Sequence, residues 1–139
     1  IVVTSDNTNI KGKEDLTGKT VGTQLGSTGE VACKKLEGLK NLKTYDIYTE
    51  ALNDLKTGRL NAVVTDDVTA RYYFKQQPDA FIILDDVLSY EPMGIAIRKG
   101  DNNFREVLNK EIEGMIDDGT YKTISEKWFG EDMSQFLNN

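Results

Sequence analysis

The stretch that decides the fold is Val21-Gly22-Thr23-Gln24-Leu25-Gly26-Ser27-Thr28-Gly29-Glu30. Its apolar start predicts a short β-strand, and its glycines predict a turn that leads directly into an α-helix. Backbone N–H groups at a helix start, together with the positive end of the helix dipole, attract carboxylates and phosphates. Gly26 lets the backbone come close to a ligand, and the hydroxyls of Ser27 and Thr28 add donors. The stretch therefore predicts a strand, a turn and a helix with a candidate anion site between them.

The same turn has a second interpretation that needs no ligand. Ser27 and Glu30 fit the S-x-x-E capping box, in which the serine hydroxyl accepts a hydrogen bond from the backbone of its own helix. The sequence leaves both interpretations open.

A second apolar run, residues 60–65, ends in the two carboxylates of Asp66 and Asp67. Its distance from the first strand fits a second β-α unit, and open α/β sheets bind ligands at the carboxyl ends of their strands. An anion site at one strand end would bind the negative group of a ligand, and the Asp66 carboxylate at the neighbouring strand end would bind a positive group. The pair therefore suits a zwitterionic ligand. The alternative is that the acidic pair caps the helix that follows, and Asp67 is the better candidate for that cap.

Strand and helix patterns alternate along the first hundred residues. We expect strands at residues 20–24, 42–46, 62–66, 81–84 and 93–98, and helices at residues 27–39, 49–57 and 67–77. This alternation predicts an α/β fold with a mostly parallel sheet and helices on both faces. After Gly100, apolar residues recur at helical spacing from Phe104 to Ile116. Gly119 fits a C-terminal cap, and a shorter helix through Trp128 follows.

Composition limits the classes of function. The 139 residues are 38% hydrophobic and 29% charged, which is ordinary for a globular domain with one core. The net charge of −6 argues against a nucleic-acid partner. The chain contains no histidine, the commonest general base and metal ligand, so we expect neither an enzyme nor a metal or other cofactor. Cys33 is the single cysteine, and we expect it to pack in the core with Leu36.

Several segments together resemble a known family. They are Glu14-Asp15-Leu16-Thr17-Gly18-Lys19-Thr20-Val21-Gly22, Gln24-Leu25-Gly26-Ser27-Thr28, residues 48–59, Asp66-Asp67, residues 94–100, Gly119-Thr120-Tyr121 and Lys127-Trp128-Phe129-Gly130. In this order they resemble the extracellular solute-binding proteins of polar amino-acid ABC importers, which are periplasmic binding proteins of type II. The matching segments cover nearly the whole chain. Each one alone occurs in many proteins, but all of them in this order are specific to the family.

The resemblance implies one lobe of a two-lobed receptor. Residues 1–98 resemble the second lobe with both hinge strands, and residues 99–139 resemble the C-terminal helices, which in the family pack on the first lobe. We therefore expect the chain to be a fragment, a truncation or a chimera. In the family, the first lobe carries the arginine that binds the ligand α-carboxylate and most of the side-chain pocket, so the choice of amino acid belongs to that lobe.

The residues and the resemblance together predict the site. Gln24, just before the glycine turn, is similar in place to a family position that can touch the ligand side chain. Gly26, Ser27 and Thr28 would hold the α-carboxylate, and Asp66 would accept hydrogen bonds from the α-ammonium. The expected partners are a free amino acid and, for the full-length parent, the membrane subunits of an ABC transporter. The resemblance places that parent at the extracellular face, either in the periplasm or anchored by lipid to the cell surface.

Two alternatives belong to other classes. The same module occurs as a ligand-sensing lobe of signalling receptors, and the chain could also be an engineered or assembling scaffold that has lost binding. Association is a further hypothesis, because the apolar stripe from Phe104 to Ile116, continued by Trp128, lacks its family partner surface. The opening strand, Ile1-Val2-Val3-Thr4, is expected to pair with the returning strand at residues 93–98. Exchange of terminal elements between identical chains would bury both features in a homodimer.

Overall fold

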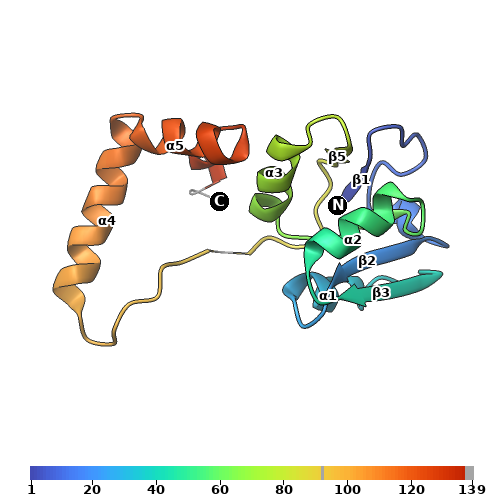
Figure 1. The fold of residues 1–139 in the computed structure, drawn as a ribbon. Coiled ribbons are helices and arrows are strands. Elements are labelled where there is room, and N and C mark those ends of the chain that lie inside the picture. The colour runs from blue at the N-terminus through green and yellow to red at the C-terminus, as the bar shows by residue number, and fades with distance from the viewer. Residues whose placement is uncertain (92, 137–139) are drawn as a thin grey trace. The chain divides into compact units, whose positions relative to one another are not determined.

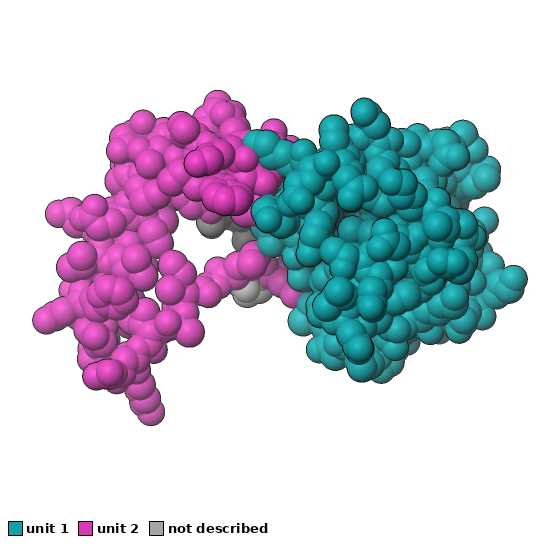
Figure 2. Space-filling view, viewed as in Figure 1, with its two compact units in different colours: residues 1–90 teal, residues 91–139 magenta. Residues whose placement is uncertain are grey.

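The computed structural model describes residues 1–91 and 93–136. The chain divides into two compact units, Ile1–Tyr90 and Glu91–Asn139, which are coloured teal and magenta in Figure 2. Within the described residues, no helix has both the length and the apolar character that a membrane crossing needs.

Unit 1 is built on a five-stranded sheet with the order β3-β2-β4-β1-β5. Its strands are β1 (Val2–Thr4), β2 (Thr20–Gln24), β3 (Asn41–Tyr45), β4 (Ala62–Val63) and β5 (Phe81–Ile83). Strand β2 pairs in parallel with β3 and β4, whereas β1 lies antiparallel between β4 and β5. The α/β fold with a mostly parallel sheet is therefore confirmed, and β2, β3 and β4 end at the same edge of the sheet.

Helices cover both faces of this sheet (Figure 1). They are α1 (Thr28–Cys33), α2 (Tyr48–Lys56) and α3 (Asp67–Gln76), together with a 3-10 turn, η1 (Lys13–Leu16). Successive strand residues point to opposite faces. Val2 and Val63 accordingly join the core cluster beneath α2 and α3, while Val3 and Ala62 join a second cluster with η1 and α1.

Cys33 lies in the second cluster and is fully buried. Leu36 packs against the same cluster, which confirms the predicted packing role of this cysteine. Burial raises the pKa of the Cys33 thiol to about 11, because the apolar surroundings disfavour the thiolate.

Helix α1 is shorter than the predicted helix at residues 27–39. It ends at Cys33, and the chain continues in tight turns in which Lys35 N–H donates to Ala32 O and Leu36 N–H donates to Cys33 O. Gly38 then adopts a φ of 77°, a left-handed conformation that no α-helix contains. These turns keep Leu36 on the core side, so the apolar spacing continues although the helix does not.

The predicted strand at residues 93–98 and its predicted pairing with β1 are wrong. Residues 93–98 form no strand, and Met93 and Ile95 are exposed. The physical reason lies in β1, because a strand has only two hydrogen-bonding edges and those of β1 are occupied by β4 and β5.

Unit 2 contains α4 (Asn102–Asp117), α5 (Thr120–Phe129) and a 3-10 turn, η2 (Met133–Phe136). Asp101 caps α4 by accepting a hydrogen bond from Phe104 N–H at 3.2 Å, and Gly119 separates the two helices with a φ of 79°. Both helices and the glycine cap were predicted. Helix α4 contains no buried residue. The large apolar residues exposed on the two helices are Phe104, Val107, Ile116, Ile124 and Trp128.

We expect Leu55→Ala to destabilise unit 1 strongly. Leu55 is 1% exposed and lies in the cluster beneath α2, so its truncation should lower the free energy of unfolding by about 2–5 kcal/mol. The matched control is Leu25→Ala, because Leu25 is 59% exposed and its truncation should change stability by no more than about 0.5 kcal/mol. Urea unfolding followed by circular dichroism measures both. Equal effects of the two variants would contradict the described core.

Candidate functional site

The predicted site residues lie at the edge where β2 and β4 end. The two strands are hydrogen-bonded neighbours, and Val64 N–H donates to Gly22 O at 2.9 Å. The first turn of α1 packs against this strand pair, because a Cβ atom on Gly29 would lie 2.9 Å from Thr23 Oγ1 and 3.5 Å from Val64 Cγ1. Gly29 therefore permits the close approach of α1 to the end of β4. The turn after β2 and the acidic residues after β4 occupy adjacent positions on one edge.

Gly26 forms the corner of the turn with a φ of 73°. Its N–H group donates to Glu30 Oε2 at 2.7 Å, so one donor of the turn already binds a carboxylate of the same chain. The other oxygen of that carboxylate, Oε1, lies 2.6 Å from the Lys34 ammonium. The hydrogen bond from Lys34 and the one from Gly26 N–H lower the pKa of Glu30 from its ordinary value of 4.5.

Ser27 caps α1 as the capping-box interpretation predicted. Its Oγ accepts a hydrogen bond from Glu30 N–H at 3.1 Å. The same hydroxyl donates its proton to Gln24 O at 2.8 Å. The Ser27 hydroxyl is thus engaged within the turn. Thr28, in contrast, is exposed, and its hydroxyl takes part in none of the side-chain hydrogen bonds found among the described residues.

Gln24 is held at the end of β2. Its Nε2 atom donates to Asp46 O at 2.8 Å, which ties the ends of β2 and β3 together. The amide lies at the edge of the sheet, and its predicted contact with a ligand side chain stays a prediction.

Asp66, not Asp67, is the N-cap residue of α3, so the prediction about the cap is wrong. Asp66 has an extended backbone, with φ −62° and ψ 141°, but its side chain makes no capping hydrogen bond. Asp67 is the first residue of the helix, and its Oδ2 pairs with Arg71 Nε at 2.6 Å. The pairing uses the Asp67 carboxylate on its own helix and leaves the exposed Asp66 carboxylate directed to solvent. The predicted contact of Asp66 with an ammonium group stays a prediction.

Sequence reasoning missed two features of this edge. The Oγ1 atom of Thr65, directly before Asp66, is buried without a hydrogen-bond partner among the described residues. Glu30 was read only as a capping partner, although it is buried and charged. The S-x-x-E pattern was the available signal for Glu30. Thr65 had no such signal, because the burial of one atom depends on how the chain turns after β4.

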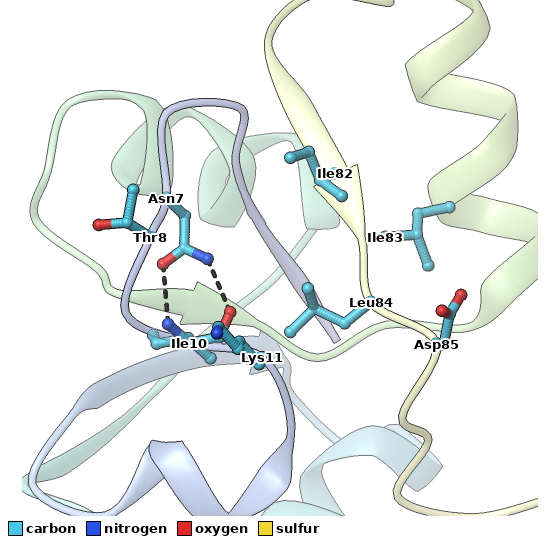
Figure 3. A pocket seen from close by; sticks show the side chains of 8 residues that line it. All are labelled: Asn7, Thr8, Ile10, Lys11, Ile82, Ile83, Leu84 and Asp85. Carbon is cyan, nitrogen blue, oxygen red and sulfur yellow. Dashed lines mark hydrogen bonds between the residues drawn. The ribbon is translucent and has the colours of Figure 1, made fainter.

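A cavity of about 320 Å³ lies elsewhere on unit 1, between β5 and the loop that follows β1 (Figure 3). Asn7 shapes this loop, because its Nδ2 donates to Ile10 O at 2.7 Å and its Oδ1 accepts from Ile10 N–H at 3.1 Å. The cavity is lined by Asn7, Thr8, Ile10, Lys11, Ile82, Ile83, Leu84 and Asp85. None of the predicted site residues belongs to this lining.

Comparison with known proteins identifies the relatives of the chain. The model of the family described as bacterial extracellular solute-binding proteins, family 3, matches residues 1–131. The L-cystine-binding protein TcyJ of Escherichia coli K12 is 33% identical over 126 residues, which are 91% of this chain and 47% of TcyJ. The chain therefore spans about half the length of this curated relative.

Two solved structures extend the comparison. An ancestral arginine-binding protein bound to glutamine is 49% identical, with a TM-score of 0.70 over 94% of this chain and 58% of that protein. Domain 2 of TmArgBP, solved by itself, is 39% identical, with a TM-score of 0.55 over 62% of this chain and 91% of that domain. The second structure shows that this domain folds without the rest of its protein in that relative.

We expect the Gly26 amide proton to report the ionisation of Glu30. The pKa of Glu30 is lowered in the folded chain, so its stabilising effect is complete above the unfolded value of 4.5 and is lost as pH falls through the folded value. The Gly26 amide resonance should shift with a midpoint below 4.5 in an NMR pH titration. Glu30→Gln should abolish the shift, whereas Glu37→Gln, an exposed control, should not. A midpoint at or above 4.5 would contradict the described hydrogen bond.

Proposed function

The chain belongs to the bacterial extracellular solute-binding proteins, family 3, and on this premise we propose that it is the ligand-binding part of a receptor for a polar amino acid. The full-length receptor delivers that amino acid to the membrane subunits of an ABC importer. It works at the extracellular face, in the periplasm or on a lipid anchor. The chain binds its ligand without catalysing a reaction.

The exposed Asp66 carboxylate is the observation that carries this proposal. It lies at the end of β4, next to the turn at the end of β2, and is not used for capping α3. An α-amino acid carries its carboxylate and its ammonium on the same carbon atom, so the two groups that bind them must lie close together. Within the Gly26–Thr28 turn, Thr28 contacts the carboxylate through its exposed hydroxyl, because the N–H groups of Gly26 and Ser27 are bonded to Glu30 Oε2 and Gln24 O. Asp66 accepts hydrogen bonds from the ammonium.

Gln24 contacts the ligand side chain in this proposal. Its hydrogen bond to Asp46 O fixes the amide at the edge of the sheet, and an amide provides both donors and an acceptor. The relatives are named as amino-acid-binding proteins, such as the L-cystine-binding protein TcyJ and an ABC transporter arginine-binding protein of Escherichia coli K12. This favours a transport receptor over a signalling lobe or a scaffold without binding.

The interaction of one lobe with a ligand is weak, because an open site leaves its charge pairs in water. The apolar helices of unit 2 are the second element of the proposal. Helix α4 has no buried residue, and contiguous exposed apolar surfaces mark interaction sites. We infer that these helices pack on the other lobe in a full-length receptor, and on a second copy in solutions of the 139-residue chain.

Asp66→Ala should weaken the binding of amino acids by about 1–3 kcal/mol, because the ligand ammonium loses its charged partner. The control is Asp79→Ala, which removes an exposed carboxylate beyond the far end of α3 and should leave affinity unchanged. NMR shift titration of the ¹⁵N-labelled chain against a panel of free amino acids, at millimolar concentrations, measures both variants. Equal affinities of Asp66→Ala and the unmodified chain would exclude the proposed role. Absence of saturable shifts with every amino acid would count against the function itself.

The 139-residue chain should form a dimer at micromolar concentration. Val107 on α4 is 59% exposed, and Val107→Lys should shift the population toward the monomer by placing a charge in the contact. Val31→Lys is the matched control, since Val31 is 56% exposed but belongs to unit 1. Light scattering coupled to size exclusion gives the masses. A monomeric mass for the unmodified chain would rule out the dimer.

A further inference from the structure

A second cavity of unit 1, with a volume of about 300 Å³, lies at the edge of the sheet where β2 and β4 begin. Lys19 directly precedes β2, Asn61 directly precedes β4, and the loop after β1 lines the cavity as well. The candidate amino-acid site lies at the opposite edge, and none of its residues lines this cavity. Liquid water occupies about 30 Å³ per molecule, so the cavity has room for a small ion with part of its hydration shell.

Three charged side chains line this cavity, those of Lys19, Lys56 and Asp6. In the part of the chain that the structure describes, neither lysine forms an ion pair, and Asp6 is exposed and pairs with neither of them. The chain as a whole has 23 acidic and 17 basic residues. A cavity with two ammonium groups and one carboxylate therefore has the opposite charge balance from the rest of the protein.

Neutral donors line the same cavity. Asn61 Oδ1 accepts a hydrogen bond from Thr20 N–H at 2.9 Å, so the Nδ2 group of Asn61 is left to donate to another acceptor. Asn9 lies on a loop that Asn7 holds in place, because Asn7 Oδ1 accepts from Asn9 N–H at 3.3 Å and Asn7 Nδ2 donates to Ile10 O at 2.7 Å. Binding groups on an ordered loop lose less conformational entropy when a ligand engages them.

The C-terminal end of α2 meets the cavity at Lys56, and the carbonyl groups of a helix end repel anions. Here the chain that follows the helix binds those carbonyl groups. Asn53 O accepts from Thr57 N–H at 3.1 Å, and Asp54 O accepts from the N–H groups of residues 59 and 60 at 2.9 and 3.2 Å. These hydrogen bonds reduce the repulsion and leave the positive charge of the two lysines in excess.

We propose that this cavity is a binding site for a tetrahedral oxyanion, namely a phosphate or sulfate group. Lys19 and Lys56 attract its negative charge, and the amides of Asn9 and Asn61 donate hydrogen bonds to its oxygens. Hydrogen bonds between charged donors and anionic oxygens are the stronger ones, and a dianion gains from both ammonium groups at once. Asp6 opposes the anion and limits its affinity. A free ion and the phosphate of a lipid headgroup share this chemistry.

The test titrates the ¹⁵N-labelled chain with sodium sulfate, while sodium chloride keeps the ionic strength constant. The amide resonances of Asn9, Gly58 and Asn61 should shift and saturate at millimolar sulfate. Lys19→Gln and Lys56→Gln should each lower the affinity about fivefold, the factor that one unit-charge attraction near 4 Å contributes in water.

Lys35→Gln is the matched control, because it removes the same charge at an exposed position after α1, away from the cavity. It should leave the affinity for sulfate unchanged. Asp6→Asn should raise the affinity by a similar factor, because it removes the one repelling charge in the lining. Absence of saturable shifts, or an equal loss in Lys35→Gln and Lys19→Gln, overturns the site. Asp66→Ala should not affect sulfate binding, so this site and the amino-acid site fail independently.

Two further measurements distinguish the sources of the anion. Sodium phosphate replaces sulfate in the same titration, and vesicles of phosphatidylglycerol are sedimented with the chain, with phosphatidylcholine vesicles as the uncharged control. Binding of both ions without sedimentation identifies a free ion as the ligand. Sedimentation that Lys19→Gln and Lys56→Gln reduce and Lys35→Gln does not identifies a lipid headgroup. Sedimentation that all three variants retain excludes the headgroup as a ligand of this cavity.

Discussion

Strands β1 and β4 have no face turned to solvent, and the rest of unit 1 depends on this constraint. Val2 and Val63 point into the cluster beneath α2 and α3, while Val3 and Ala62 point into the cluster with η1 and α1. A sheet that is buried on both faces has polar groups available only at its strand ends. The turn after β2 and the carboxylate after β4 lie at such ends, so the proposed binding groups are where the core leaves room for them.

Much of unit 1 was predictable because each of its strands is followed within three residues by a glycine or an acidic residue, and because β1, β4 and β5 are short, mainly apolar runs. The strand at residues 20–24 was predicted with its observed bounds. The helix at residues 27–39 was not, because Leu36 keeps its place in the core through tight turns after Cys33, and spacing alone cannot distinguish these turns from a helix. The segment at residues 93–98 has the composition of a strand, but a strand also needs an available neighbour, and composition does not reveal which edges of β1 are already paired.

The candidate site also has features that the sequence predicts and features that it does not. The glycine turn and the strand-end carboxylates were visible in the sequence, because residue type and spacing determine them. Which of two adjacent aspartates faces solvent depends on where α3 begins, and a shift of one residue exchanges their environments. In the structure Asp67 pairs with Arg71 one turn later, and the Asp66 side chain makes no capping bond. For Glu30, the S-x-x-E pattern indicated a role in the turn, but it did not indicate that the charged side chain is buried.

The environment of Cys33 has a practical consequence for measuring ligand binding by fluorescence. The only cysteine of the chain is fully buried, and its thiol, with a pKa of about 11, is almost entirely protonated at neutral pH and reacts poorly with electrophiles. A cysteine introduced at an exposed position of the strand-end edge would therefore be modified selectively by a maleimide dye, without removal of the native thiol. The native thiol therefore contributes no background signal, and a dye attached to the introduced cysteine reports on the strand-end edge alone.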